Sequence, residues 1–396
     1  MKLLAFLLAA PLLLAQDGAG PLIHSMDDLQ VRLPAKNGHA ETVDGKVGKA
    51  VKFSFDKDCS GDFCATPIRG NAEWDKAAGF SFWLKGDGSK NFGGLQFIWN
   101  DDYAARYDLM FPIDSTEWKK IVVPWRDLIP ALPPPSAKFL DPKSGNAPSK
   151  LSSLWFGKWW YWREYGAHSY SIDEMRLEPR IDLDTNLYLP SGAPLARVQA
   201  KLKAGKPITI VTMGDSLTDT HHWANRTINW PGLLTKKLQD RKVDARIVNP
   251  AIGGTELRQN LVLMPRWLAE APEPDLVTVC FGGNDWNSGM RGPVFQETVR
   301  ETIDRIRRAT KGKADVLILT TVPSLEMWKT RDELGEAARA AAKERKAGLA
   351  DAEKAFHDTP EDQREKLFCS DKVHMGAPGH ETLASLVVAA MESGGK

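Results

Sequence analysis

The pattern of apolar residues changes at Lys206, and this change constrains the fold more than any other feature. After it, continuous apolar runs alternate with helix-length stretches. Continuous runs are typical of strands that are covered on both faces of a sheet, so the alternation predicts a doubly wound α/β domain with a parallel sheet. The runs are 208–213, 245–248, 276–281 and 316–319, and two of the helical stretches are 230–242 and 294–311.

Residues 20–180 follow a different pattern, in which short runs have the period of a strand and turn residues separate them. Many short strands without a convincing helix predict an antiparallel β-sandwich. A chain of 396 residues is also long for one core, which agrees with two domains. We expect a sandwich at 20–180, a linker at 181–206 and the α/β domain at 207–396.

The first fifteen residues predict a secretory signal peptide. Lys2 precedes an apolar run at 3–14 that is too short to span a bilayer, and Ala15 follows it. An N-terminal anchor or a buried helix is the alternative. We therefore expect a secreted or periplasmic protein without integral membrane association, in which Cys59 and Cys64 form a local disulfide rather than two unpaired thiols.

The charges exclude one class of partner. The chain has 52 basic and 51 acidic residues, a net charge of +1, so no overall field would concentrate it on nucleic acid or on an anionic membrane. No CxxC pair or histidine cluster with metal-ligand spacing occurs. We expect no metal and no organic cofactor.

Four short motifs carry the chemistry. Three of them follow the first three apolar runs after Lys206, and the fourth precedes a helix expected at 379–391. In doubly wound sheets, functional groups gather at the carboxyl ends of the strands, so all four motifs are expected at one edge. The motifs are Gly214-Asp215-Ser216-Leu217, Gly253-Gly254, Gly282-Gly283-Asn284-Asp285 and Asp371-Lys372-Val373-His374.

In this order the motifs resemble the SGNH or GDSL-type hydrolase family, from about Lys206 to the C-terminus. The resemblance implies a flavodoxin-like domain that transfers acyl groups by way of a serine. It assigns Ser216 as the nucleophile, His374 as the general base and acid, and Asp371 as the residue that orients the imidazole. It also implies an oxyanion hole formed by the backbone N–H groups of Ser216 and Gly254 and by the side-chain amide of Asn284.

The residue types fit that chemistry. A serine hydroxyl is a poor nucleophile unless a base lies within hydrogen-bond reach, and a carboxylate on the second ring nitrogen of the base stabilises the imidazolium. The alternative for Gly214-Asp215-Ser216 is a plain turn with a helix N-cap. Asp215 and Asp285 are interpreted as structural supports. His221, His222 and His380 have no partner readable from sequence, so loop and helix-surface positions are expected for them.

The sandwich half has its own resemblance. The stretches 79–88, 118–125 and 172–177 resemble galactose-binding-like jelly rolls, which often serve as carbohydrate-binding modules. The densest aromatic stretch is 155–162, where strand alternation would send Trp155, Trp159 and Tyr161 to one face and Phe156, Trp160 and Trp162 to the other. One set is expected in the core. The other could stack on sugars, on itself or on the second domain, which makes Trp159, Trp160 and Trp162 candidates for substrate binding.

The segment 330–366 is long and highly charged. We interpret it as a solvated helical insertion, with a lid or a cleft wall as the alternative because it leads into Asp371.

Together these features favour a secreted serine esterase that removes small acyl groups, acetyl first among them, from a carbohydrate. The same residues would also serve a lipase or lysophospholipase. A non-catalytic glycan-binding protein that uses the α/β domain as a scaffold is the hypothesis from another class.

Overall fold

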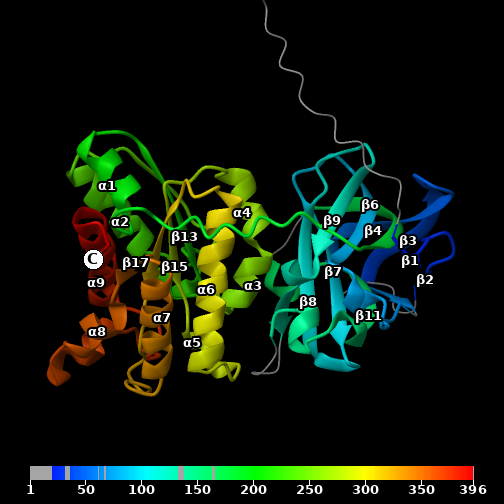
Figure 1. Ribbon diagram of the computed structural model, residues 1–396. Helices are drawn as coiled ribbons and strands as arrows, with labels where there is room; N and C mark the ends of the chain where they lie inside the picture. The colour runs from blue at the N-terminus through cyan, green and yellow to red at the C-terminus, as the bar shows by residue number, and fades with distance from the viewer. Residues whose placement is uncertain are drawn as a thin grey trace, which may run out of the picture.

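The computed structural model describes residues 20–31, 36–60, 62–66, 68–132, 138–162 and 166–395. They form a β-sandwich and a three-layer α/β body that lie side by side (Figure 1), so both predicted fold classes are confirmed. Within these ranges no helix has the length and apolar character needed to cross a bilayer. The predicted signal peptide at 1–15 and the side chain of Cys64 lie outside the described residues, so export and the disulfide stay predictions.

The sandwich consists of two six-stranded sheets in which every pairing is antiparallel. Apolar side chains of both inner faces, many of them aromatic, form one core. The first sheet has the order β3 (Lys36–Asp44), β4 (Lys49–Ser60), β12 (His168–Glu178), β6 (Gly79–Gly86) and β9 (Lys119–Pro124), with β1 (Leu22–His24) also on β12. The second has the order β10 (Ile129–Leu132), β8 (Asp102–Pro112), β7 (Phe92–Trp99), β11 (Leu151–Gly157), β5 (Asp62–Thr66) and β2 (Gln30–Val31).

The α/β body has a five-stranded, fully parallel sheet with the flavodoxin-like order 2-1-3-4-5. Successive side chains of its strands are buried on opposite faces, which explains why the sequence runs are apolar throughout. The strands in spatial order are β14 (Ala245–Val248), β13 (Ile208–Gly214), β15 (Leu276–Cys280), β16 (Asp315–Leu319) and β17 (Gly348–Ala350).

Helices cover both faces of this sheet. Helix α2 (Trp230–Asp240) begins at Asn229, whose side chain accepts a hydrogen bond from the Gly232 N–H at 2.7 Å. Together with α1 (Ala196–Lys203), α8 (Ala352–His357) and α9 (Ala377–Ser393), it packs on one face. On the other face lie α3 (Leu257–Val262), α4 (Met264–Glu270), α6 (Gly292–Ala309) and α7 (Asp332–Glu344), of which α3, α4 and α6 separate the sheet from the sandwich (Figure 1).

Two predicted segments are corrected. The linker prediction for 181–206 is wrong in its second half, because α1 buries Val198 completely and the Asp315 carboxylate accepts from the Val198 N–H at 2.9 Å. At 330–366 the predicted helical structure is present, but the prediction of an insertion is wrong, since this segment supplies α7, β17 and α8 of the α/β domain. Strand β17 pairs in parallel with β16, and four of the five alanines of α7 are buried. Apart from the buried Arg331 and Glu353, the charged side chains of this segment are exposed or half-buried on amphipathic elements, and they concealed its place in the fold.

The aromatic stretch is not one strand. Strand β11 ends at Gly157 and a 3-10 turn follows at Trp160–Trp162, so the predicted alternation stops there. Trp159 and Trp162 are 5% and 0% exposed and join the apolar cluster that extends into α3, α4 and α6, whereas Trp160 is 63% exposed. Burial leaves Trp159 and Trp162 no free face, so sugar stacking is wrong for them and stays a prediction for Trp160.

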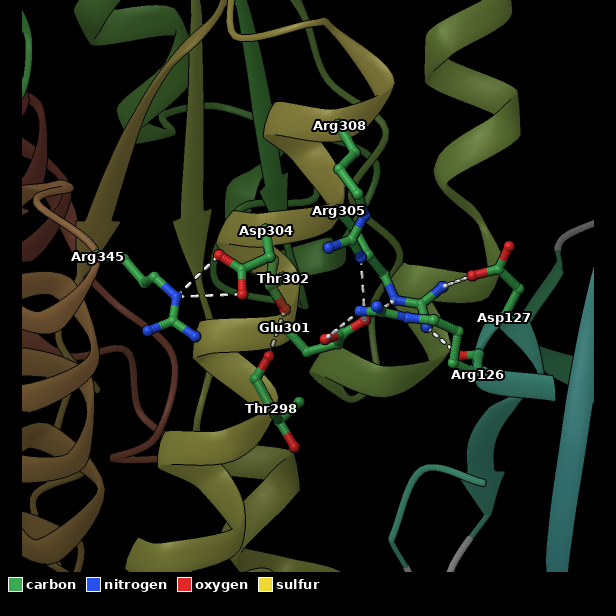
Figure 2. A network of polar contacts seen from close by, with 9 residues as sticks. All are labelled: Arg126, Asp127, Thr298, Glu301, Thr302, Asp304, Arg305, Arg308 and Arg345. Carbon is green, nitrogen blue, oxygen red and sulfur yellow. Dashed lines mark hydrogen bonds and ion pairs between the residues drawn. The ribbon is translucent and has the colours of Figure 1, made fainter. Parts of the chain in front are cut away.

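A polar network reinforces this junction. Figure 2 shows Glu301 of α6 between Arg126 of the sandwich and two arginines of its own helix. The Glu301 carboxylate lies 2.8 Å from Arg305 Nε, 3.2 Å from Arg308 Nη2 and 3.3 Å from Arg126 Nη2. Burial alone would raise the pKa of Glu301, but the three guanidinium groups outweigh it and lower that pKa. The ionised carboxylate therefore holds together charges from both halves of the chain.

We expect the Glu301→Gln variant to lose roughly 3 kcal/mol in the free energy of unfolding at neutral pH, because the largely buried Arg305 and Arg308 and the partly buried Arg126 lose their counter-charge. Since the pKa of Glu301 is lowered by folding, its contribution should disappear as the pH falls through that pKa. Urea unfolding at several pH values measures both effects.

Glu344→Gln is the matched control. Glu344 also faces an arginine, Arg300 at 3.1 Å, but on an exposed surface, so the loss should stay below about 1 kcal/mol. Equal losses in the two variants would show that the Glu301 network does not hold the halves together.

Candidate active site

All four sequence motifs lie at the carboxyl edge of the parallel sheet. Ser216 follows β13, Gly254 lies in the loop after β14, and Asn284 is in α5 (Gly283–Asn287), directly after β15. His374 lies in the loop that precedes α9. The expected convergence therefore results from the strand order, which places β13 between β14 and β15.

Three side chains form a continuous hydrogen-bonded line. His374 Nε2 is 2.9 Å from Ser216 Oγ, and His374 Nδ1 is 2.5 Å from Asp371 Oδ2. The second oxygen of Asp371 accepts from the backbone N–H groups of His374 at 3.0 Å and Val373 at 3.2 Å. This is the geometry in which an imidazole can take a proton from a serine hydroxyl while a carboxylate holds the ring.

The carboxylate of Asp371 is kept ionised. Partial burial would raise its pKa, but the hydrogen bonds from the His374 ring and from the His374 and Val373 backbone outweigh burial and lower it. An ionised Asp371 fixes the ring proton of His374 on Nδ1, which leaves Nε2 free to accept from Ser216.

The glycine loop is tied to the serine loop by two side chains that the sequence reasoning did not select as site residues. The Asp219 carboxylate accepts from the Gly253 N–H at 3.0 Å, and Asn249 Nδ2 donates to the Thr218 carbonyl at 2.8 Å. Gly254 adopts φ +81°, a left-handed conformation that favours glycine. Asp219 lies two residues after the first motif and Asn249 four residues before the second. This proximity to the motifs was the sequence signal that could have identified them as site residues.

Asn284 is anchored to the same loop. One of its amide hydrogens is used in the bond from Nδ2 to the Thr255 carbonyl at 3.0 Å. An amide nitrogen has two hydrogens, so a second donor is available in this half-buried position. The roles of Ser216, Gly254 and Asn284 as oxyanion donors stay a prediction that this arrangement supports.

Two rings that the sequence did not reveal surround His374. The His222 ring stacks on it, with centroids 4.3 Å apart, and the Trp223 ring meets it at 5.4 Å and 66°. Burial lowers the pKa of His222, and the nearby His374 lowers it further. His380 is fully buried in α9, and burial lowers its pKa to about 4. The expectation of loop and helix-surface positions was therefore wrong for His380 and incomplete for His222.

Three carboxyl groups are buried beneath the site. Asp215 Oδ1 accepts from the Leu217 N–H and Asp285 Oδ1 from the Leu257 N–H, in agreement with structural roles. Burial raises the pKa of Asp215 to about 7, that of Asp285 to about 6 and that of Glu256 to about 7. The charge of Asp285 also disfavours ionisation of the other two.

Among the described residues, one group has the composition of a metal site. Ligand atoms of Asp332, Glu353 and His357 lie within 4.8 Å of one another. Arg339 already donates to Glu353 at 2.8 Å, and His357 Nε2 lies 2.6 Å from the Trp328 carbonyl, a contact in which the ring nitrogen donates. The guanidinium beside Glu353 and the proton on His357 Nε2 both disfavour a cation at this group.

Two family models match separate parts of the chain. Residues 212–382 match the GDSL-like lipase/acylhydrolase family, and this range includes all four motifs. Residues 25–133 match the carbohydrate-binding domain of family 11. Both agree with the resemblances inferred from sequence.

Individual proteins are similar to the C-terminal half. Esterase TesA of Pseudomonas aeruginosa is 32% identical over 111 residues, which are 28% of this chain and 53% of that protein. Thioesterase 1/protease 1/lysophospholipase L1 of Escherichia coli K12 is 29% identical over 107 residues, 27% of this chain and 49% of that protein. The chain thus spans about half the length of the curated relatives it matches. A variant of Axe2, an acetyl xylan esterase from Geobacillus stearothermophilus, is a structural match at 22% identity and a TM-score of 0.39, covering 46% of this chain and 94% of that one.

The buried carboxyl groups generate a prediction for stability. Folding raises the pKa of Asp285 from 3.8 to about 6, so the folded protein holds this proton more tightly and the free energy of unfolding should fall as the pH rises across that window. Asp285→Asn keeps an acceptor for the Leu257 N–H and removes the titration. Between pH 4.5 and 7 the variant should lose roughly 2 kcal/mol less stability than the parent protein, measured by urea unfolding.

Asp44→Asn serves as the control, because it removes an exposed carboxyl whose pKa is lowered by its partner Lys49. The Asp44→Asn variant should lose as much stability between about pH 4.5 and 7 as the parent protein does. If the free energy of unfolding of Asp285→Asn depends on pH as that of the parent protein does, the buried carboxyl of Asp285 does not cause the loss of stability.

Proposed function

We propose that this chain, which carries a GDSL-like lipase/acylhydrolase domain at residues 212–382, is a secreted serine esterase that removes small acyl groups, acetyl first among them, from a carbohydrate. The observation that carries the proposal is the line from Ser216 Oγ through His374 to Asp371, with distances of 2.9 and 2.5 Å. It contains a nucleophile, a base and an ionised orienting group, which are the parts that acyl transfer by serine requires.

The reaction follows from these positions. His374 Nε2 takes the hydroxyl proton as Ser216 Oγ attacks the ester carbonyl, and Asp371 stabilises the resulting imidazolium. The tetrahedral oxyanion accepts from the N–H groups of Ser216 and Gly254 and from the second amide hydrogen of Asn284. His374 then gives its proton to the leaving alcohol oxygen, and the acyl group stays on Ser216. Water repeats the sequence and releases the carboxylic acid.

The carbohydrate part of the proposal depends on the sandwich. Residues 25–133 match a family 11 carbohydrate-binding domain, and a sugar polymer bound there would be held beside the α/β domain. Export is consistent with such a substrate but depends on residues 1–15, outside the described part of the chain. We retain 20–180 as the proposed bounds of the sandwich, and we extend the predicted 207–396 of the α/β domain to include α1.

Lipid esters are the second candidate, because the name of the Escherichia coli relative includes lysophospholipase. A series of acyl esters from acetate to palmitate separates the two. Falling kcat/KM with chain length supports the acetyl proposal, and a preference for long chains refutes it in favour of a lipase. No hydrolysis of any ester would leave the non-catalytic glycan-binding hypothesis.

Ser216→Ala should lower kcat on aryl acetate by at least about 1,000-fold, because it removes the atom that carries the acyl group. Ser385→Ala, an exposed serine on α9, should change kcat by less than about twofold and controls for handling and folding. A loss of less than tenfold in Ser216→Ala would sink the assignment.

Asn284→Ala should lower kcat by about 100- to 1,000-fold with little change in KM, since the donor acts on the oxyanion of the transition state. Asn287→Ala is the matched control on the same short helix; the Asn287 side-chain oxygen accepts from Arg331 at 3.4 Å. If the two variants lose equal activity, Asn284 acts through the stability of α5 and not on the oxyanion.

A further inference from the structure

Trp223 is an exposed tryptophan beside the candidate catalytic histidine. Its side chain is 53% exposed although its ring lies 5.4 Å from that of His374. An indole left open next to a reactive group is placed to contact whatever binds there. The sandwich tryptophans Trp159 and Trp162 differ, because they are enclosed by the protein itself.

The backbone holds Trp223 in a fixed place relative to Ser216. Trp223 begins a 3-10 turn that ends at Asn225, a fully buried residue. Asn225 Nδ2 donates to the carbonyl of Ser216 at 2.6 Å and to that of Asp219 at 2.8 Å. The turn carrying the exposed ring is therefore bonded directly to the residue that would be acylated.

The position also identifies which half of an ester the ring would meet. In the proposed reaction, His374 Nε2 gives its proton to the leaving alcohol, so groups around the His374 ring lie on the alcohol side. The oxyanion donors of Gly254 and Asn284 mark the carbonyl. Trp223 is on the histidine side, where the alcohol would lie.

The histidine loop and the segment bonded to it carry further exposed apolar side chains. Val373, next to His374, is 40% exposed, and Met327 is 37% exposed. The Leu325 N–H donates to the Lys372 carbonyl at 2.9 Å, which brings the Met327 segment beside the histidine loop. An aromatic face with an apolar border suits the C–H face of a pyranose ring better than a charged headgroup.

We propose that Trp223 is the platform on which the sugar ring of the leaving alcohol stacks. This inference rests on the proposed function and adds the subsite for the sugar next to the scissile ester. It places the selection of the alcohol in the α/β domain itself, on a residue that lies seven positions after the nucleophile.

The test compares two acetate esters that give the same acetyl-enzyme and differ only in the alcohol. One is ethyl acetate, and the other is the best substrate among acetylated xylo-, manno- and galacturono-oligosaccharides. Trp223→Ala should lower kcat/KM about tenfold on the sugar ester and less than about twofold on ethyl acetate, with Trp223→Phe in between. Leu189→Ala, which removes another exposed large apolar side chain, should match the parent protein on both esters.

Other results overturn the inference. Equal losses on the two esters would show that Trp223 positions the His374 ring, and no loss on the sugar ester would show that it does not bind the alcohol. If the parent protein hydrolyses ethyl acetate but no sugar ester, the carbohydrate substrate and this subsite both fail while the esterase assignment stands. If it hydrolyses neither, the proposed function itself fails. Thermal unfolding of each variant verifies that the fold is intact.

Discussion

Helix α3 is enclosed on every side, and the geometry of the site depends on this. All six residues of Leu257–Val262 are buried. Arg258 is one of them, and burial lowers the pKa of its guanidinium. One side of α3 packs against β10 and β8 of the sandwich. On another side, Arg258 Nε donates to the hydroxyl of Thr298 in α6 at 3.1 Å. A short helix has little stability of its own, so the packing around α3 keeps it in place.

The loops at the start of α3 connect this packing to the chemistry. The Leu257 N–H is bonded to Asp285 and the Thr255 carbonyl to Asn284, so α3 and α5 fix each other. By packing against α3, the sandwich therefore stabilises the loop that carries Gly254 and the helix that carries Asn284. This role is separate from any binding of sugar. The cost is the burial of Asp215, Asp285 and Glu256, which hold their protons to a higher pH than ordinary carboxyls.

Sequence reasoning succeeded where a local pattern has one structural solution. Continuous apolar runs located β13 to β16, and the motif order located Ser216, His374 and Asp371 within bonding distance of one another. It failed where packing overrides the local pattern. The charged surface of α7 hid its buried alanines, and the strand period assumed for 155–162 stops at Gly157. The contacts of His222 and Trp223 with His374 were missed because His374 lies about 150 residues away in the chain.

The sequence by itself determined the two fold classes, the parallel strands and the identity of the residues able to perform acyl transfer, because periodicity and motif order are local properties of the chain. Only the tertiary structure decided which tryptophan is exposed beside His374, that 330–366 belongs to the sheet, and that the sandwich encloses α3. The physical reason is that burial depends on which surfaces meet after the chain folds, and residues far apart in sequence supply those surfaces.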